Sequence, residues 1–275
     1  NIGAKPVIES LEKDNLSYDV IKVDNASEES ILEVEELITP NTTVLGVGGG
    51  KVIDVAKLSS FNKGVYFVSM PTTASHDGIV SPLASIKNSN TSISATAHSP
   101  IAVIADSEII AQSPFRLLAA GCADLIANFT AIKDWELAHR LKNEAFSESA
   151  AALSIMSAHL ITDNISNIKP NLEPSARIVM KSLFSGGMAI SIAGSSRPAS
   201  GSEHLFSHAL DKILDFHADN YMNGKIPKNK QLVFTELDVK EFIDSRADEL
   251  AEDARNYIAS QNLDNSIISF AELKG

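Results

Sequence analysis

VLGVGGGKVIDVAK, residues 44–57, places three consecutive glycines between a short apolar run and an amphipathic pattern. The run indicates a β-strand, and the pattern after the glycines indicates the start of a helix. Glycine permits backbone angles closed to other residues, and the first N–H groups of the helix would point into the turn. A phosphate or pyrophosphate is the ligand that such a turn favours. The alternative is a turn that only lets helix and strand pack closely, because the stretch matches neither GxGxxG nor a Walker loop.

Strands and helices alternate through the first 113 residues. Helices are predicted over residues 4–14 and from Ser27 onward, the second with an apolar face of Ile31, Val34, Leu37 and Ile38. Strands are predicted over residues 18–23, 44–47, 65–70 and 101–105, and a hairpin or surface loop over the Ser/Thr-rich residues 85–99. This alternation predicts a parallel, doubly wound α/β sheet.

The pattern changes near Pro114. Residues 115–140, 147–168 and 174–194 read as helices rich in Ala, Ser, Leu and Ile, and strand signals vanish. We therefore predict an α/β domain over residues 1–113 and a helical domain over residues 114–275. A cleft between two such domains is a usual place for a binding site.

Composition limits the classes of function. The 275 residues carry a net charge of −12, which argues against nucleic acid as a partner. The single cysteine, Cys122, excludes an internal disulfide and suits a reducing cytoplasm. No apolar run approaches the ~20 residues that span a bilayer, and no signal peptide is visible. We predict a cytoplasmic protein without membrane insertion and, because the chain begins at Asn1 and not at Met, a further segment upstream.

A polar segment follows the strand predicted over residues 65–70. It reads Thr72-Thr73-Ala74-Ser75-His76-Asp77. Ligands of open α/β sheets lie beyond the carboxyl ends of the strands, so these hydroxyls can bond a cofactor and Asp77 can reach a substrate hydroxyl. A capped turn is the alternative, because Ser, Thr and Asp are also ordinary turn residues.

Asp124 and two histidines could form a metal site. His204 and His208 have the i,i+4 spacing that puts both rings on one helix face. Two imidazoles that converge with a carboxylate can bind a divalent ion and leave a position open for substrate. The alternatives are a helix-capping role for Asp124 and histidines satisfied by hydrogen bonds, since the glutamate of HExxH is missing.

Other residues have a simpler interpretation. Arg197 could bind a phosphate through its guanidinium group, or could form a surface salt bridge. The remaining histidines are predicted to be structural or solvated, and Trp135 to belong to the core; these histidines are His76, His98, His139 and His159.

Four segments together resemble a known family. They are GGGKVID at 48–54, PTTASHDG at 71–78, GCAD at 121–124 and SRPASGSEH at 196–204. The resemblance is to the glycerol dehydrogenase and iron-dependent alcohol dehydrogenase group, related in fold to dehydroquinate synthase, and within it to the glycerol-1-phosphate dehydrogenase branch. The first segment is shared across the group, whereas SHDG and SRPASGSEH are more specific to the branch. The resemblance runs from about residue 16 to about residue 213.

The resemblance implies both a fold and a set of site residues. The fold is an N-terminal Rossmann-like, NAD(P)-binding α/β domain followed by a helical metal and substrate domain, as in dehydroquinate synthase. Asp77, Asp124 and His208 would contact substrate and take part in catalysis, and Asp124 and His204 would bind Zn²⁺ or another divalent ion. The residues implied to hold NAD(P)H are Gly50, Lys51, Val52, Ile53, Asp54, Thr72, Thr73, Ala74, Ser75 and Ser81.

The reaction implied is the reversible reduction of dihydroxyacetone phosphate to sn-glycerol 1-phosphate, the backbone of archaeal-type ether phospholipids. Zinc would act as a Lewis acid on the carbonyl, nicotinamide would deliver hydride, and a proton would come through His208 or Asp77. Binding of the substrate phosphate by Arg197 or Lys51 is our own hypothesis. We also expect a homo-oligomer. The alternatives are a glycerol dehydrogenase, a dehydroquinate synthase-like enzyme, and a non-catalytic nucleotide-binding remnant.

The sequence departs from the family pattern in two places. The family begins with a further strand–helix–strand region, and it takes a third zinc ligand from a His-Gly-Glu-Gln-type motif. Here residue 220 is asparagine, and His217 is the nearest histidine, with no glycine after it. Either a stretch after about Ile213 is missing from the sequence, which we favour, or His217 substitutes as the ligand, or the metal has been lost.

Overall fold

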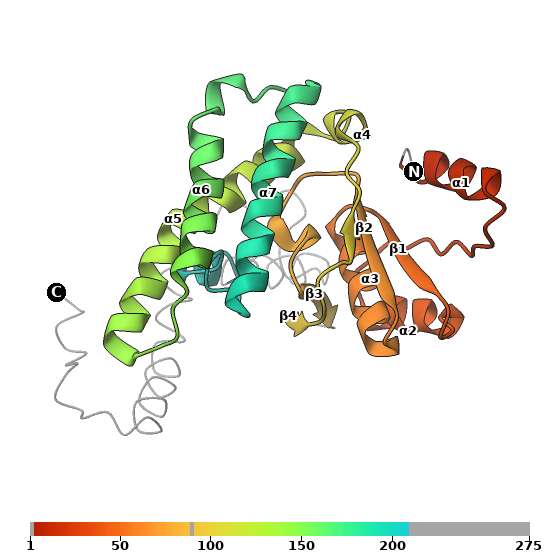
Figure 1. Ribbon diagram of the computed structural model, residues 1–275, viewed down its shortest axis with the longest axis horizontal. Helices are drawn as coiled ribbons and strands as arrows, with labels where there is room; N and C mark the ends of the chain where they lie inside the picture. The colour runs from red at the N-terminus through yellow and green to blue at the C-terminus, as the bar shows by residue number, and fades with distance from the viewer. Residues whose placement is uncertain (1–2, 89–90, 209–275) are drawn as a thin grey trace, which may run out of the picture. The chain divides into compact units, whose positions relative to one another are not determined.

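The computed structural model describes residues 3–88 and 91–208 (Figure 1). The chain divides into two compact units between Ser207 and His208, and the elements below belong to the first of them, except that the last helical stretch ends at His208, the first residue of the second unit. The predicted domain boundary near residue 114 lies inside this first unit and stays a prediction.

A parallel sheet forms the centre of the N-terminal part. Its strands are β1 (Thr43–Gly48), β2 (Tyr66–Pro71) and β5 (Ala102–Val103), in the spatial order β1-β2-β5. In the register of the first pair, Gly48 lies opposite Pro71. Because parallel strands end at one edge, the glycine turn after β1 and the polar segment after β2 begin side by side.

Helices α1 (Ala4–Lys13), α2 (Glu28–Leu37) and α3 (Gly50–Lys63) confirm the helices predicted in this part. The Ser27 side chain caps α2 by accepting a hydrogen bond from the Ser30 backbone N–H. Helix α3 packs on β1 and β2, which Figure 1 shows behind it. The contact is close at Gly46, where an added Cβ would lie 3.0 Å from the Ala56 Cβ.

Two predicted strands differ in the structure. Residues 18–23 form no strand, and Tyr18 and Val20 are 39% and 65% exposed. The prediction was wrong because alternation of apolar residues makes a strand only where a neighbouring strand supplies hydrogen bonds and buries one face. The strand predicted over residues 101–105 shortens to β5, which pairs with β2 through Val68 and Ser69.

A short helix and a hairpin lie between β2 and β5 in the chain, and a second short helix follows β5. Strands β3 (Leu83–Asn88) and β4 (Thr91–Thr96) pair antiparallel, with Leu83 opposite Thr96, so the hairpin prediction is confirmed. The 3-10 helix η1 (Asp77–Ile79) precedes them. Helix α4 (Ser107–Ala111) is capped by Asp106, whose carboxylate accepts from the backbone N–H groups of Glu108 and Ile109.

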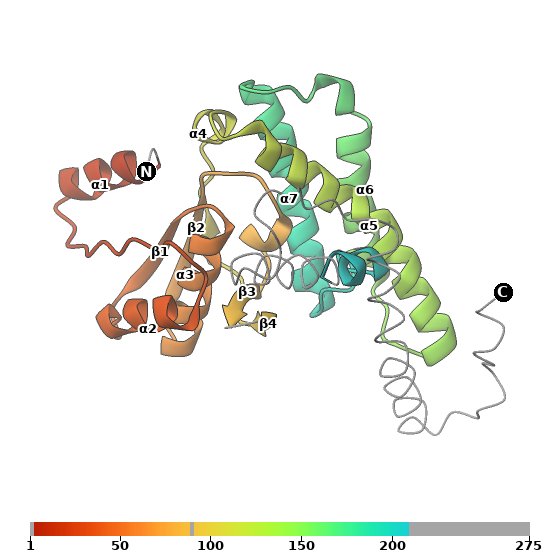
Figure 2. The same cartoon turned by 180° about the vertical axis from the view of Figure 1, so that it is seen from behind.

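The C-terminal part of the described chain is helical, as predicted. It contains α5 (Phe115–Lys142), α6 (Glu148–Thr162), the 3-10 helix η2 (Ile165–Asn167), α7 (Glu173–Ala193) and a helical stretch at 202–208. Helix α6 packs against both α5 and α7, as both views show (Figures 1 and 2). The helix predicted over residues 147–168 ends earlier, at Thr162, and the separate 3-10 helix η2 occupies the last part of the predicted range.

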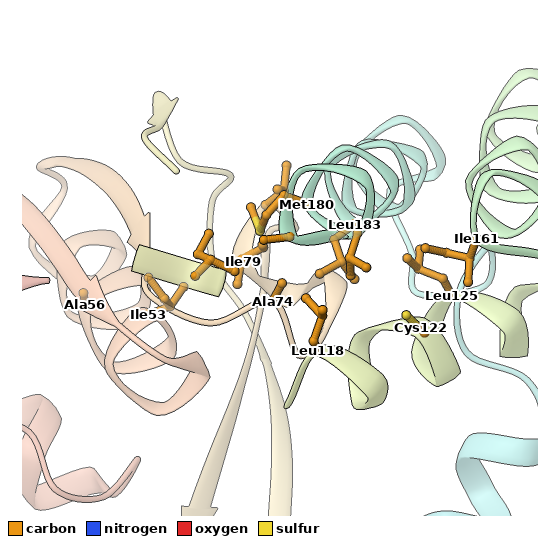
Figure 3. Packing of buried hydrophobic residues seen from close by; sticks show 14 of the residues in the cluster. Ile53, Ala56, Ala74, Ile79, Leu118, Cys122, Leu125, Ile161, Met180 and Leu183 are labelled. Atoms are coloured by element: carbon orange, nitrogen blue, oxygen red, sulfur yellow. The ribbon is translucent and has the colours of Figure 1, made fainter. Parts of the chain in front are cut away.

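One hydrophobic core joins α3, η1, α5, α6 and α7. Each contributes a side chain that is at most 1% exposed, and these are Ile53, Ile79, Leu125, Ile161 and Leu183 (Figure 3). A fully buried aliphatic side chain contributes roughly 1.5–3 kcal/mol. The core therefore fixes η1, which carries Asp77, between α3 and the helices.

Two helices are long and apolar enough, by length and composition alone, to cross a membrane. They are α5 and α7, with 39% and 50% of their most apolar windows buried inside the structure. Core helices of soluble proteins pass the same test, so the finding is weak evidence and the expectation of no membrane insertion stays a prediction.

Candidate active site

The glycine turn and the polar segment after β2 are tied together. The Thr72 backbone N–H donates to the Gly48 carbonyl at 2.9 Å, across the carboxyl ends of β1 and β2. Among the described residues, the glycines with positive φ are Gly64 and Gly194, so none in the turn uses the left-handed region. The turn therefore does not use the positive φ angles that glycine permits. What the turn requires is space, since an added Cβ at Gly50 would overlap the His76 ring.

The residues predicted to hold NAD(P)H divide into two groups. Thr72, Thr73 and Ser75 are half-buried in the segment beside the turn, and Val52 is half-buried in the first turn of α3. Lys51 is exposed, and its Nζ donates to Asn25 Oδ1 at 3.4 Å.

The second group has buried side chains. Ile53 lies in the core, Asp54 pairs with Lys57, and Ala74 and Ser81 are buried. A cofactor contact from Ile53 or Asp54 would therefore use main-chain atoms. Cofactor binding by both groups stays a prediction.

Asp77 and Asp124 meet although they are far apart in the sequence. The Asp77 backbone N–H donates to Asp124 Oδ2 at 2.9 Å. Helix α5 approaches closely because residue 121 is glycine, and an added Cβ there would overlap the Ala74 carbonyl oxygen. Asp124 lies well inside α5, whose N-cap is Pro114, so the alternative of a capping role is wrong.

His204 faces Asp124 from the segment that follows α7. Its Nε2 lies 3.8 Å from Asp124 Oδ1, and its Nδ1 lies 2.8 Å from Glu203 Oε1. Glu203 Oε1 also accepts from the Gly201 backbone N–H at 3.0 Å, and Asp134 accepts from the Ser202 N–H at 2.6 Å. If Nδ1 carries the proton and donates a hydrogen bond to Glu203, the Nε2 atom has a lone pair on the side of Asp124.

His76 belongs to this group, although the sequence analysis placed it among structural or solvated histidines. Its Nδ1 accepts from the Gly78 N–H at 3.0 Å and caps η1, and its ring lies against Gly50. The hint in the sequence was its position between two predicted site residues, Ser75 and Asp77. The other three histidines have local structural contacts: His98 with Ser60, His139 with the Glu144 carbonyl and His159 with Phe129.

Burial dominates the electrostatics of the cluster. It raises the pKa of Asp77 well above its usual range, and the Asp124 charge raises it further. Burial also raises the pKa of Asp124, while His76 and His204 act in the opposite direction. The pKa of His76 is lowered, again chiefly by burial. Burial and mutual repulsion of charge thus disfavour the ionised forms of both carboxyl groups. A bound cation would stabilise those ionised forms.

Asp124 and His204 fit two ligands of one divalent ion. Ligand atoms about 2.1 Å from a tetrahedral zinc lie roughly 3.4 Å apart, close to the 3.8 Å between Asp124 Oδ1 and His204 Nε2. Residues 3–88 and 91–208 contain no set of three His, Cys, Asp or Glu that could hold a metal. The third predicted ligand, His217, lies outside the described residues, and His208 is exposed at the end of the 202–208 stretch.

Arg197 is engaged by a carboxylate. Its Nε and Nη2 donate to the two oxygens of Glu144 at 2.6 and 2.7 Å. This bidentate pair is the salt bridge that the sequence analysis left as an alternative. Binding of a substrate phosphate by Arg197 stays a prediction and would require the guanidinium group to change partner.

Comparisons with known proteins place this geometry in context. Residues 1–114 match the family described as iron-containing alcohol dehydrogenase. The chain is 75% identical over 215 residues to glycerol-1-phosphate dehydrogenase, NAD(P)+, of Methanobrevibacter smithii, and 59% identical over 212 residues to the enzyme of that name from Methanothermobacter thermautotrophicus. The matches cover 78% and 77% of this chain but 62% and 61% of the relatives, so the chain spans about three fifths of their length.

Solved structures share the fold. Glycerol dehydrogenase from Schizosaccharomyces pombe superposes with a TM-score of 0.66 at 19% identity, covering 78% of this chain and 56% of that one. The iron-containing alcohol dehydrogenase from Thermotoga maritima gives a TM-score of 0.56 at 15% identity, covering 70% of this chain and 58% of that one. The predicted combination of a Rossmann-like α/β part and a helical part, as in the dehydroquinate synthase-like fold, is thereby confirmed.

Proposed function

We propose that this chain, a homologue of the glycerol-1-phosphate dehydrogenases and a relative of the iron-containing alcohol dehydrogenases, reduces dihydroxyacetone phosphate reversibly to sn-glycerol 1-phosphate with NAD(P)H. The activity is proposed for the intact protein, because the chain spans about three fifths of the length of these relatives. The product would supply the backbone of archaeal-type ether phospholipids.

One observation carries the proposal. Asp124 lies between the Asp77 N–H at 2.9 Å and the His204 ring at 3.8 Å, and η1 with Asp77 follows the polar segment beside the glycine turn. The proposed metal ligands, the proposed substrate-binding residue Asp77 and the proposed cofactor loop therefore lie close together. A reductase needs that grouping, since the carbonyl carbon and the hydride donor must be in contact.

Asp124 and His204 would hold a divalent ion, with His217 as the third ligand proposed from the sequence. When bound, zinc would supply Lewis-acid polarisation of the C2 carbonyl. Glu203 Oε1 would accept a hydrogen bond from the Nδ1–H of His204 and so orient the ring with Nε2 toward Asp124.

The remaining roles belong to groups around this pair. The glycine turn and the N–H groups at the start of α3 would bind the pyrophosphate of NAD(P)H, which supplies the hydride. Asp77 and His208 are proposed to bind the substrate hydroxyl groups and to pass a proton between solvent and the C2 oxygen. Arg197 or Lys51 is proposed to bind the substrate phosphate.

The setting of the enzyme is also proposed. The low cysteine content and the acidic charge fit a cytoplasmic protein without nucleic-acid partners. A homo-oligomer is proposed on the resemblance alone, and sedimentation of the intact protein would test it.

The test is a comparison of two ketones. Purified protein is supplied with NADH or NADPH and with either dihydroxyacetone phosphate or dihydroxyacetone, and cofactor oxidation is followed by absorbance. Oxidation that requires the phosphate ester, with a product that sn-glycerol-3-phosphate dehydrogenase does not oxidise, supports the proposal. Oxidation with dihydroxyacetone alone would show a glycerol dehydrogenase, and no oxidation of either cofactor would contradict both.

A further inference from the structure

Lys57 is a lysine with no exposed surface. Its side chain lies at 0% exposure inside α3, the helix that begins at the glycine turn. Burial lowers the pKa of the Lys57 ammonium group, whereas Asp54 and Asp77 raise it. Removing an ammonium group from water costs several kcal/mol, so a lysine in this place requires compensating partners.

Lys57 has three partners, which match its three N–H donors. The Nζ donates to the carbonyl oxygens of Gly78 and Leu83, each at 2.5 Å, and lies 3.6 Å from Asp54 Oδ1. Asp54 in turn accepts a hydrogen bond from the backbone N–H of Ser85. The pair thus bonds to three backbone groups of the segment 78–85.

These backbone groups are close to the proposed chemistry. Gly78 is the second residue of η1, and its neighbour Asp77 donates its N–H to Asp124 Oδ2. Leu83 begins β3, at the other end of the segment that η1 opens. Lys57 therefore connects α3, which begins at the proposed cofactor turn, with the turn that contacts Asp124.

We propose that Lys57 is a positioning residue: it clamps the Gly78 and Leu83 carbonyls so that Asp77 is held at Asp124 in register with the glycine turn of α3. The proposal rests on the proposed reductase function. Asp54 balances the charge of the clamp, and Lys57 supplies the geometry.

A purely stabilising role leads to a different expectation. Replacing both members of a buried ion pair by uncharged groups of similar size is often neutral for stability, whereas removing one member leaves the other charge unpaired. If Lys57 acted only through stability, the paired replacement would restore activity together with the melting temperature. A clamp on two carbonyls cannot be restored in this way, because the uncharged side chains offer those carbonyls no donor at the same place.

The experiment uses Lys57→Met, Asp54→Asn and the double variant Asp54→Asn/Lys57→Met in the intact protein. Melting temperature, NAD(P)H dissociation constant, and kcat and KM for dihydroxyacetone phosphate are measured for each. We expect Lys57→Met to lower the melting temperature and the double variant to recover most of that loss. The double variant should nevertheless show kcat/KM reduced at least about tenfold, as small displacements of reacting groups do.

The control readouts separate positioning from general damage. Lys63→Met, at a half-exposed α3 lysine beside Glu35, should keep kcat/KM within about threefold of the wild type, while the cofactor dissociation constant should change less than about twofold in the double variant. A folded double variant with wild-type kcat/KM overturns the inference. If the double variant does not fold, Lys57→Arg provides the test, because arginine keeps the charge but moves the hydrogen-bond donors. A folded Lys57→Arg protein with wild-type kcat/KM would also overturn the inference. A wild-type protein inactive on the ketone phosphate overturns the proposed function and this inference with it.

Discussion

At the scale of single residues, Asp124 is where the separate parts of the proposed site meet. Sequence patterns place Asp77, Asp124 and His204 in three separate segments, and only the fold brings them together. One carboxylate accepts from the Asp77 N–H and faces His204 Nε2 at 3.8 Å. A carboxylate with partners on two elements and a pKa raised by burial is a candidate for a functional site.

Asp124→Asn tests this role directly. The substitution keeps the size of the side chain and an acceptor for the Asp77 N–H but removes the charge that a cation needs. We expect bound metal to be lost at chelator concentrations at least about tenfold lower than for the wild type, and kcat/KM to fall about 100-fold or more. Metal content after dialysis and steady-state kinetics are the measurements. Glu136→Gln is the control, because Glu136 is an α5 carboxylate paired with Lys133 on the surface.

Asp54 gives a pH prediction of defined sign. Burial raises the pKa of its carboxyl group from 3.8 to about 6, although Lys57 opposes the change. Because the pKa is higher in the folded state, the contribution of Asp54 to stability is complete below pH 3.8 and is lost as the pH rises through about 6. The loss is roughly 3 kcal/mol for a shift of about two units.

The measurement is urea unfolding of the wild type and of Asp54→Asn between about pH 4 and pH 6.5, since other carboxyl groups also titrate and only the difference isolates Asp54. We expect the free energy of unfolding of the wild type to decrease relative to that of the variant as the pH rises. A difference that stays constant across this range would contradict the raised pKa.

At the scale of elements, the turn between β1 and α3 shows what its glycines provide. No glycine of the turn has a positive φ, and its requirement is room for His76 from the segment after β2, because an added Cβ at Gly50 would overlap His76 Nε2. The turn and the β2 segment therefore constrain each other. The His76 ring lies against Gly50 and also lies near Asp124. We therefore expect a substitution at Gly50 to displace His76 and to affect the proposed site.

Gly50→Ala and Gly64→Ala distinguish two reasons for a glycine: lack of space for a side chain at Gly50 and a positive φ angle at Gly64. At Gly50 the added methyl group would overlap His76 Nε2, so we expect weaker NAD(P)H binding and kcat/KM reduced at least about tenfold. At Gly64, the C-cap of α3, φ is +66° and no atom lies within 4 Å of the added carbon. Alanine there should cost about 1 kcal/mol of stability and leave cofactor binding unchanged. Cofactor titration and thermal melting of both variants provide the test, and equal cofactor affinities would argue against a role for the turn in binding.

At the scale of the whole molecule, the features that sequence could predict are those that depend on local order. The helices and the β1 and β2 strands follow from periodicity over neighbouring residues, and the hairpin from its composition. The prediction of a strand at residues 18–23 was wrong because strand pairing depends on a partner that is distant in the sequence. The contacts of Lys57 and Glu203 were likewise missed: Lys57 bonds to Gly78 and Leu83, 21 and 26 residues away, and no spacing rule predicts such contacts. Asp124 and His204 were found because the resemblance joined two distant segments that the residues alone left ambiguous.

Removal of the metal tests the molecule as an assembled whole. If Asp124 and His204 hold an ion with a further ligand, the ion links α5 to the segment after α7 and favours the folded state. At a free-ion concentration about 1,000 times the dissociation constant, such binding stabilises by roughly 4 kcal/mol. We therefore expect a chelator to abolish ketone reduction and lower the melting temperature, and added zinc to restore both. Asp124→Asn should melt at the same temperature with and without chelator. If the wild type keeps its activity after dialysis against a strong chelator, with no metal detected by mass spectrometry, the juxtaposition of Asp124 and His204 must serve a purpose other than binding an ion.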